Sequence, residues 1–204
     1  MTYKTEQESF WAGEFGNEYI KRNCDSKTLA GKIALFSDVL AKTHKIENVI
    51  EFGANIGFNL QAIKTLLPDI HVSAIEINKN AVTELKKMQY IEVFQQSILD
   101  FSSEKKWDLT FTAGVLIHIN PEMLSIVYDL LYKHSNRYIM ICEYYNPKPV
   151  EIDYRGNAGK LFKRDFAGEL MDRFPNLKLV DYKFKYHRDN VFPRDDVTWF
   201  LLKK

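Results

Sequence analysis

The residues with the clearest chemical potential lie where a short apolar segment ends and the chain turns. Residues 49–57 read Val-Ile-Glu-Phe-Gly-Ala-Asn-Ile-Gly, an apolar run followed by a turn with two glycines. A second apolar segment, 71–75, is followed by Glu76. Glycines let the backbone approach a ligand closely, and an acid at the end of the next strand accepts hydrogen bonds from ribose hydroxyls. The spacing predicts a site for an adenosine-containing cofactor, with Glu76 as the ribose acceptor.

The details of this turn distinguish between adenosine cofactors. A dinucleotide turn usually has three glycines, the middle one against the pyrophosphate, whereas the middle position here is Asn55. Glu51 would repel a pyrophosphate but suits a cationic amino-acid group. The turn resembles the acid-x-Gly-x-Gly-x-Gly motif of class I S-adenosylmethionine (SAM) methyltransferases, and Asn tolerates left-handed backbone angles better than most residues. SAM is therefore favoured over NAD, and the expected cofactor-binding residues in this region are Glu51, Gly53, Ala54, Asn55, Gly57, Glu76 and Ile77.

From residue 48 onward, strand and helix patterns alternate, which is typical of a parallel sheet covered on both faces. We expect strands at 48–52, 71–76, 91–95, 108–113 and 137–143, with helices at about 57–66, 78–88, 121–134 and 165–174. The segments 177–187 and 196–202 are rich in β-formers and could pair antiparallel. The predicted fold is α/β and Rossmann-like, of the class I methyltransferase type: a seven-stranded, mostly parallel sheet with an antiparallel C-terminal strand.

The first 46 residues read as a helical lid on a core formed by 47–204, within a single domain of 204 residues. We expect helices at about 6–22 and 27–42, with a break at 23–26. Tyr19 and Arg22 share a helix face. A guanidinium pairs bidentately with a carboxylate, so Arg22 could close on the cofactor's carboxylate. The alternative is a solvated arginine on an amphipathic helix.

Two later strand ends supply further cofactor contacts by analogy with the same methyltransferases. Ser97 would meet the adenine amino group and Ile98 would pack on the ring, although most members of that family have Asp at the Ser97 position. The alternative is a capped turn before Asp100. Ala113, Gly114 and Val115 follow the fourth strand, and their small size would allow close backbone approach to the cofactor. His118 is either a general base or a wall of the site.

The fifth strand runs directly into polar and aromatic residues, which face the ligand site in open α/β sheets. A Pro-rich stretch at 146–160, taken as a functional loop, and further cations follow. Aromatic hydroxyls beside cations suit an acidic sugar. The predicted substrate-binding residues are Tyr144, Tyr145, Asn146, Arg155, Lys163 and Arg164, and the candidate general bases are Glu143, His118 and His187.

Composition excludes several function classes. The 28 basic and 27 acidic residues nearly balance, which argues against nucleic acid as the main partner. No signal peptide and no membrane-spanning run is recognisable. Cys24 and Cys142 have no metal-ligand spacing and are expected to be free thiols in a reducing cytoplasm. We expect a cytoplasmic enzyme without a metal that acts on a small molecule as a monomer or homodimer.

Longer phrases carry a more specific resemblance. "FWAGEFGNEYIKRN", "EFGANIGFNL", "EYYNPKPVEIDYRGNAGKLFKRDFAGELMDRFP" and "DDVTWFLLKK" are similar to small methylases associated with pseudaminic acid biosynthesis in bacteria. The resemblance implies a SAM-dependent methyltransferase that acts on a nonulosonic acid sugar, its nucleotide conjugate or a precursor during surface-glycan synthesis. The alternatives are a NAD-dependent sugar-modifying enzyme and a non-catalytic SAM-binding regulator.

Overall fold

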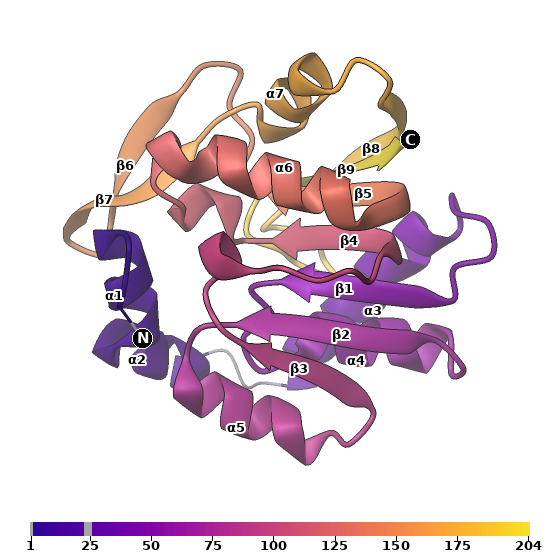
Figure 1. The fold of residues 1–204 in the computed structure, drawn as a ribbon, viewed down its shortest axis with the longest axis horizontal. Helices are drawn as coiled ribbons and strands as arrows, with labels where there is room; N and C mark the ends of the chain where they lie inside the picture. Colours follow the sequence, from indigo (N-terminus) through magenta and orange to yellow (C-terminus); the bar gives the residue numbers. More distant parts are fainter. Residues whose placement is uncertain (1, 23–25) are drawn as a thin grey trace.

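The computed structural model describes residues 2–22 and 26–204, and in this part of the chain seven strands form one large sheet and two form a separate hairpin (Figure 1). The sheet order is β3-β2-β1-β4-β5-β9-β8. Strands β1 to β5 are parallel, and β9 lies antiparallel between β5 and β8. The predicted Rossmann-like sheet is therefore confirmed. Its strands are β1 (Asn48–Phe52), β2 (His71–Glu76), β3 (Ile91–Gln95), β4 (Trp107–Ala113), β5 (Ser135–Glu143), β8 (Lys178–Lys185) and β9 (Val197–Lys203).

Helices cover both faces of the sheet because the strands carry apolar side chains on both sides. On one face, α3 (Ser26–Leu40), α4 (Phe58–Leu66) and α5 (Lys79–Lys87) enclose a core that includes Phe36 and Phe111. On the other face, α6 (Leu124–His134) and α7 (Phe166–Arg173) pack on Ile50 and Ile139. Three short 3₁₀ turns, η1 (Ile98–Asp100), η2 (Leu116–His118) and η3 (Pro121–Met123), connect these elements. The predicted helix at 121–134 thus begins with a 3₁₀ turn, which Asn120 caps through the Glu122 N–H at 3.0 Å.

The prediction of a loop at 146–160 is wrong, because most of this segment belongs to a separate antiparallel hairpin. Strand β6 (Val150–Tyr154) pairs with β7 (Asn157–Lys163). The turn between them places Arg155 at φ 51° and Gly156 at φ 79°. Two consecutive residues with positive φ are what the favoured two-residue hairpin turn requires, so the Arg-Gly pair creates a tight turn instead of a loop.

The N-terminal segment divides differently from the prediction. The expected helix at 6–22 is interrupted at Gly13, giving α1 (Glu6–Ala12) and α2 (Glu14–Arg22). Thr5 begins α1 with a capping box, since its hydroxyl accepts the Glu8 N–H at 3.2 Å and the Glu8 carboxylate accepts the Thr5 N–H at 2.9 Å. Helix α3 belongs to the core and not to the lid, because Phe36 and Val39 are fully buried against the sheet. Of the three N-terminal helices in the described residues, α1 and α2 stand beyond the carboxyl ends of the strands, on the same side as the β6–β7 hairpin (Figure 1).

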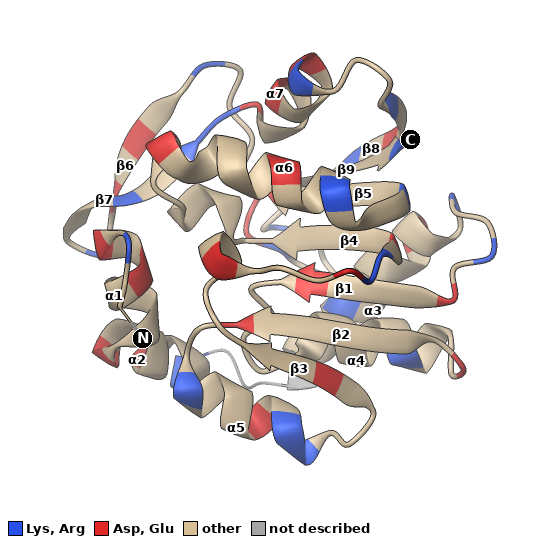
Figure 2. Cartoon of the chain, viewed as in Figure 1, with Lys and Arg blue, Asp and Glu red and all other residues tan. Residues whose placement is uncertain are grey.

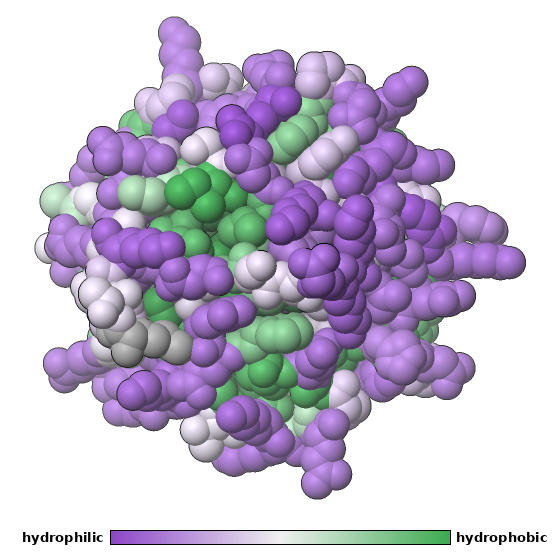
Figure 3. Space-filling view, in the orientation of Figure 1, coloured by the Kyte–Doolittle hydropathy of each residue, from purple (hydrophilic) through white to green (hydrophobic). Residues whose placement is uncertain are grey.

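The surface is mixed in charge, and acidic residues lie at the carboxyl ends of β1 and β2 (Figure 2). The face in Figure 3 is mostly hydrophilic, with apolar side chains gathered over the beginning of α6 and beside β3. Within the described ranges no helix has the length and apolar character needed to cross a bilayer. Cys142 is a buried free thiol, and burial raises its pKa to about 12. The prediction for Cys24 lies outside the described residues.

Candidate functional site

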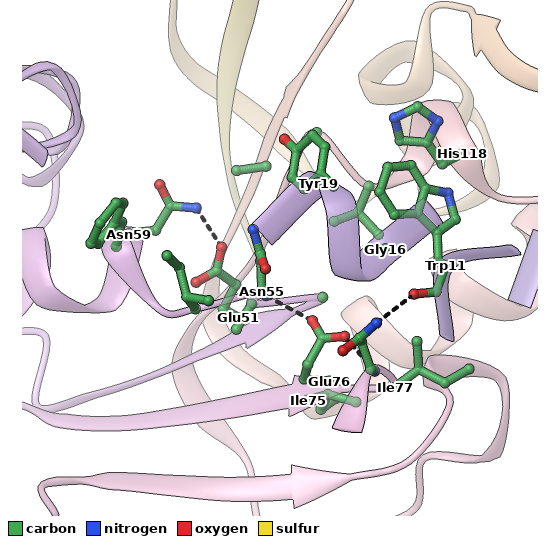
Figure 4. A pocket seen from close by; sticks show the side chains of 18 of the residues that line it. Trp11, Gly16, Tyr19, Glu51, Asn55, Asn59, Ile75, Glu76, Ile77 and His118 are labelled. Carbon is green, nitrogen blue, oxygen red and sulfur yellow. Dashed lines mark hydrogen bonds between the residues drawn. The ribbon is translucent and has the colours of Figure 1, made fainter. Parts of the chain in front are cut away.

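A cavity of about 750 Å³ opens at the carboxyl ends of β1, β2 and β4. Trp11, Gly16 and Tyr19 close one side of it from α1 and α2, opposite the ends of the strands (Figure 4). Helix α3 and residues 190–195, between β8 and β9, form the remaining walls. The carboxyl edge of an open α/β sheet is where ligands bind, so this cavity is the candidate site.

The glycine turn after β1 forms the floor of the cavity. Gly53 has φ 83°, and a Cβ there would lie 2.7 Å from Val115 Cγ2. Asn55 adopts φ 48°, as the sequence suggested it could. Gly53, Ala54 and Asn55 all line the cavity. Gly57 does not, because it faces the packed interior: a Cβ there would lie 2.7 Å from Leu85 Cδ2. Its predicted cofactor contact therefore has no support in this placement, and its φ of 81° serves the start of α4.

Glu76 is held rigidly at the end of β2. One carboxylate oxygen accepts the Asn55 N–H at 2.7 Å and the other accepts the Asn78 N–H at 2.7 Å. Burial raises the pKa of this carboxyl, and these backbone N–H groups oppose the shift. Each carboxylate oxygen keeps a further lone pair, and Glu76 and Ile77 both line the cavity. The side chain is therefore fixed in place with acceptor capacity left for a ligand.

Glu51 lies below the turn and is fully buried. Its Oε1 accepts a hydrogen bond from Asn59 Nδ2, and Asn59 Oδ1 accepts one from Lys32 Nζ at 2.7 Å (Figure 4). Glu51 Oε2 has no hydrogen-bond partner among the described residues. Burial raises the pKa of Glu51 and lowers that of Lys32. This end of the cavity therefore offers an unpartnered carboxylate oxygen beside an ammonium group.

Ser97 and Ile98 also line the cavity, as predicted from the end of β3. The Ser97 hydroxyl donates to Glu8 Oε1 and accepts the Leu99 N–H at 3.0 Å. Ser97 therefore caps the turn and also lies in the cavity wall. Glu8, which sequence reasoning missed, brings a largely buried carboxylate from α1 to the same wall.

Ala113, Gly114 and Val115 lie together at the end of β4 and line the cavity. Gly114 has φ 72°, and a Cβ there would meet no atom within 4 Å. The backbone at this point therefore faces open space, which suits close approach of a ligand.

Glu143 is buried at the end of β5. It is 2% exposed, and its carboxylate accepts the N–H groups of Val115 and Leu116 at 3.1 Å each and of Ile117 at 3.4 Å. Burial raises its pKa to about 7, against these hydrogen bonds. It does not line the cavity. Glu143 turns inward to satisfy the backbone that follows β4, so this placement gives its predicted role as a general base no support.

His118 does line the cavity. Its Nδ1 lies 2.6 Å from the Lys160 carbonyl oxygen, and its ring packs against Trp11 and Tyr154 at centroid distances of 4.5 and 4.9 Å. Burial lowers its pKa to about 4. Tyr19 lines the cavity beside Trp11, and burial raises the Tyr19 pKa to about 12.

Two other sequence-predicted residues lie away from the cavity. His187 is exposed and its Nδ1 lies 2.8 Å from Asp196, so it is not placed to act as a base. Arg22 is exposed and its guanidinium lies over the Phe15 ring, 5.3 Å from the centroid. Arg22 does not line the cavity, so this structure gives its predicted role at the cofactor carboxylate no support.

None of the predicted substrate-binding residues lines the cavity. The chain leaves β5 and turns into the β6–β7 hairpin, so these side chains find other partners. Lys163 lies over the Tyr144 ring at 5.0 Å, Arg164 pairs with Glu169 at 2.7 Å, and Tyr145 packs beside Phe200. Asn146 donates to the Lys148 carbonyl oxygen and Arg155 forms the exposed turn.

Sequence reasoning missed Trp11, Lys32 and the 190–195 segment. A topological signal for the segment exists: if 177–187 and 196–202 pair antiparallel with the second strand beside β5, their connection must lie at the carboxyl edge. Asn190, Val191, Phe192, Pro193, Arg194 and Asp195 all line the cavity. No metal-binding group of three or more His, Cys, Asp or Glu side chains occurs within residues 2–22 and 26–204.

Comparison with known proteins places the fold. No protein-family model matches the chain. The chain is 25% identical over 164 residues to mouse LisH domain-containing protein ARMC9, and the match spans only 19% of that protein. Among solved structures, magnesium protoporphyrin IX methyltransferase (ChlM) from Synechocystis with bound SAM gives a TM-score of 0.68 at 9% identity, with 100% of both chains covered. The chain has the fold of a class I SAM-dependent methyltransferase.

Two further solved structures are similar to this chain. The glycopeptide N-methyltransferase MtfA complexed with SAM gives a TM-score of 0.63 at 10% identity over 84% of this chain and 93% of that one. TehB from Haemophilus influenzae gives 0.64 at 14% identity, over 97% of this chain and 67% of that one. At these identities the likeness shows the methyltransferase fold alone.

Proposed function

We propose that this protein is a SAM-dependent methyltransferase. The observation that carries the proposal is Glu76, which is fixed by two backbone N–H groups at the cavity edge and keeps acceptor capacity beside the Gly53 turn. This arrangement suits the two ribose hydroxyls of an adenosine. Neighbours of the same fold that contain SAM, MtfA and ChlM, support the choice of cofactor.

The cavity walls fit the other parts of SAM. Ile98 supplies an apolar surface for adenine, with Ser97 and Glu8 as polar partners. Glu51 Oε2, which has no partner within the described ranges, suits the amino-acid ammonium group. The open backbone at Gly114 would lie near the sulfonium, which supplies an electrophilic methyl group when SAM is bound.

Residues of the chain position the acceptor and remove its proton. Much of such a transfer depends on proximity and orientation, which Trp11 and Tyr19 support by closing the cavity on the lid side. A hydroxyl acceptor also needs a base. His118 is the candidate base that lines the cavity. Its Nδ1 is engaged by the Lys160 carbonyl oxygen, so Nε2 is its basic nitrogen. Both oxygen and nitrogen acceptors remain compatible with this arrangement.

We further propose that the acceptor is an acidic sugar of the nonulosonic type, its nucleotide conjugate or a precursor, within cytoplasmic surface-glycan synthesis. The resemblance of the phrases at 143–175 to methylases associated with pseudaminic acid supports this. The cavity lining also presents the cations Lys32 and Arg194, beside four acidic residues, and these cations suit the carboxylate of such a ligand. In this proposal Lys32 and Arg194 take the role that the sequence suggested for Arg155, Lys163 and Arg164 after β5.

Thermal unfolding with candidate cofactors tests the proposed function. S-adenosylhomocysteine should raise the melting temperature, because a ligand at a hundredfold excess over its Kd stabilises the native state by about 2.7 kcal/mol. NAD should have no effect, since Asn55 replaces the glycine that would face a pyrophosphate. A shift with NAD and none with S-adenosylhomocysteine would refute the proposal.

A charge-removing variant sharpens this test. Glu76→Gln should weaken S-adenosylhomocysteine binding in calorimetry by roughly 1.5–3 kcal/mol, the usual loss of hydrogen bonds to a charged group. Glu84→Gln, at an exposed i,i+3 pair with Lys87 on α5, is the control and should bind normally. Unchanged affinity in Glu76→Gln would remove Glu76 from the site.

A further inference from the structure

One end of the cavity carries two cations with no role in the sequence-based prediction. Lys32 projects from α3 and donates to Asn59 Oδ1 at 2.7 Å. Arg194 belongs to the connection between β8 and β9, and both residues line the cavity. They come from segments far apart in the sequence, so only the fold brings them to the same end.

The backbone and α3 hold the Arg194 side chain in position, and no hydrogen bond or ion pair of its guanidinium occurs within residues 2–22 and 26–204. Its backbone N–H donates to the Tyr186 carbonyl oxygen at 3.1 Å, and its carbonyl accepts the Asp196 N–H at 3.0 Å. Its Cδ lies beside Gly31 of α3, where a Cβ would be 3.5 Å away. Its Nε is buried and has no hydrogen-bond partner among the described residues. A buried N–H group left unpaired is costly, so this guanidinium is poised for a ligand that accepts hydrogen bonds.

Two acids lie at this end as well, and both act on the charge of Lys32 through space. Glu51 and Asp195 line the cavity, but neither forms an ion pair with Arg194 or Lys32 in the described part of the chain. Glu51 is engaged by Asn59 instead. An arginine fork with a second ammonium nearby matches the two oxygens of a carboxylate.

We propose that Arg194 and Lys32 form a carboxylate-binding site at the α3 end of the cavity. The proposal rests on the proposed function, in which a carboxylate has two sources: the amino-acid end of SAM and an acidic acceptor. The site takes over the role that the sequence suggested for Arg22. It also makes the β8–β9 connection a ligand-binding element of the molecule.

Two pairs of probes, measured by calorimetry, test the site and separate the sources. S-adenosylhomocysteine and 5′-methylthioadenosine share the nucleoside thioether, but only the first has the amino-acid carboxylate. N-acetylneuraminic acid and its methyl ester share the sugar ring, but only the first is anionic. The sugar pair is titrated into protein saturated with S-adenosylhomocysteine and into ligand-free protein.

Arg194→Gln should reduce the preference for the carboxylate-bearing member of one pair by at least about tenfold, while the affinity of its neutral member stays unchanged. If Arg194→Gln loses the preference in the nucleoside pair, the bound carboxylate belongs to the cofactor. If it loses the preference in the sugar pair, the carboxylate belongs to the acceptor. Arg194→Lys should retain part of the preference, since it keeps the charge without the fork. Arg188→Gln, at an exposed arginine in the same connection that does not line the cavity, is the matched control and should behave as wild type.

Equal preferences in Arg194→Gln and wild type, or no preference in wild type in either pair, would overturn the proposal. If neither nucleoside binds the wild-type protein, the proposed function fails. The sugar pair on ligand-free protein then decides the carboxylate site separately. Melting temperatures of all variants without ligand establish that each one is folded.

Discussion

At the scale of single residues, His118 shows how one hydrogen bond defines a side chain's chemistry. Its Nδ1 lies 2.6 Å from a backbone carbonyl oxygen, which can only accept, so Nδ1 carries the proton. The Nε2 atom is then the basic nitrogen. Burial lowers the pKa to about 4, so the ring is neutral at physiological pH and would act as a base only if substrate binding raised this pKa.

The same burial predicts a pH dependence of stability. Between pH 6.5 and 4 the unfolded chain binds a proton at His118 that the folded chain does not, so the free energy of unfolding falls as the pH falls through this window. From pH 7.5 to 5.0, wild type should lose roughly 2 kcal/mol more than His118→Gln. Urea unfolding at both pH values measures this. Burial also lowers the pKa of His134. Because His134 is present in both proteins, its contribution cancels in the difference between them. An identical loss in the two proteins would show that the folded state leaves the His118 ring solvated.

Glu143 carries a second prediction at this scale. Its carboxylate accepts three backbone N–H groups, and an amide would turn its own N–H₂ group toward one of them. Glu143→Gln should lower the free energy of unfolding by about 1–3 kcal/mol, measured by chemical denaturation. A variant with wild-type stability but no methyl transfer would instead restore Glu143 as a catalytic base.

At the scale of elements, α1 is tied to the β6–β7 hairpin. Gln7 Nε2 donates to the Gly159 carbonyl oxygen at 2.9 Å, and Lys160 pairs with Glu6 at 2.6 Å. The Lys160 carbonyl in turn accepts the His118 ring proton. The hairpin therefore holds both the lid and the candidate base, although its own strands do not line the cavity.

This connection predicts coupled behaviour of two distant segments. S-adenosylhomocysteine should slow amide hydrogen exchange in residues 6–22 and also in 157–163, because ordering the lid orders its partner. Gln7→Ala should speed exchange in both segments of the ligand-free protein. Ser9→Ala, which removes only a local bond to the Glu6 carbonyl, is the control. Slowing confined to one segment would mean that the lid and the hairpin move independently.

The elements also show which features a sequence can reveal. The strands, the Gly53 turn and the position of Glu76 were predictable because apolar runs and glycine spacing encode them locally. The hairpin was missed because two prolines, Pro147 and Pro149, precede it and a short Arg-Gly turn closes it. Arg194 was missed because its place in the cavity depends on β9 pairing with β5, which is a long-range property. The inward placement of Glu143 was missed because alternation along β5 does not reveal that backbone N–H groups would capture its carboxylate.

At the scale of the whole molecule, α3 is part of one of the two apolar layers. Phe36 is fully buried and its ring meets Phe111 at a centroid distance of 5.4 Å. Phe36→Ala should therefore destabilise the protein by about 3–5 kcal/mol, measured by urea unfolding. Phe184→Ala, at an exposed position on β8, should change stability by less than about 0.5 kcal/mol. If Phe36→Ala lowers the free energy of unfolding by less than about 1 kcal/mol, α3 is a peripheral lid and not part of the core.

The position of β9 between β5 and β8 also affects how the molecule is made. Synthesis proceeds from the N-terminus, so β1 to β5 leave the ribosome first and β8 follows without a neighbour to pair with. Residues 197–203 must emerge before β8 joins the sheet, since β8 pairs with β9. Until then β5 presents an unprotected edge of the kind that invites association between nascent chains. The wall that carries Arg194 is consequently among the last parts of the cavity to be assembled during translation.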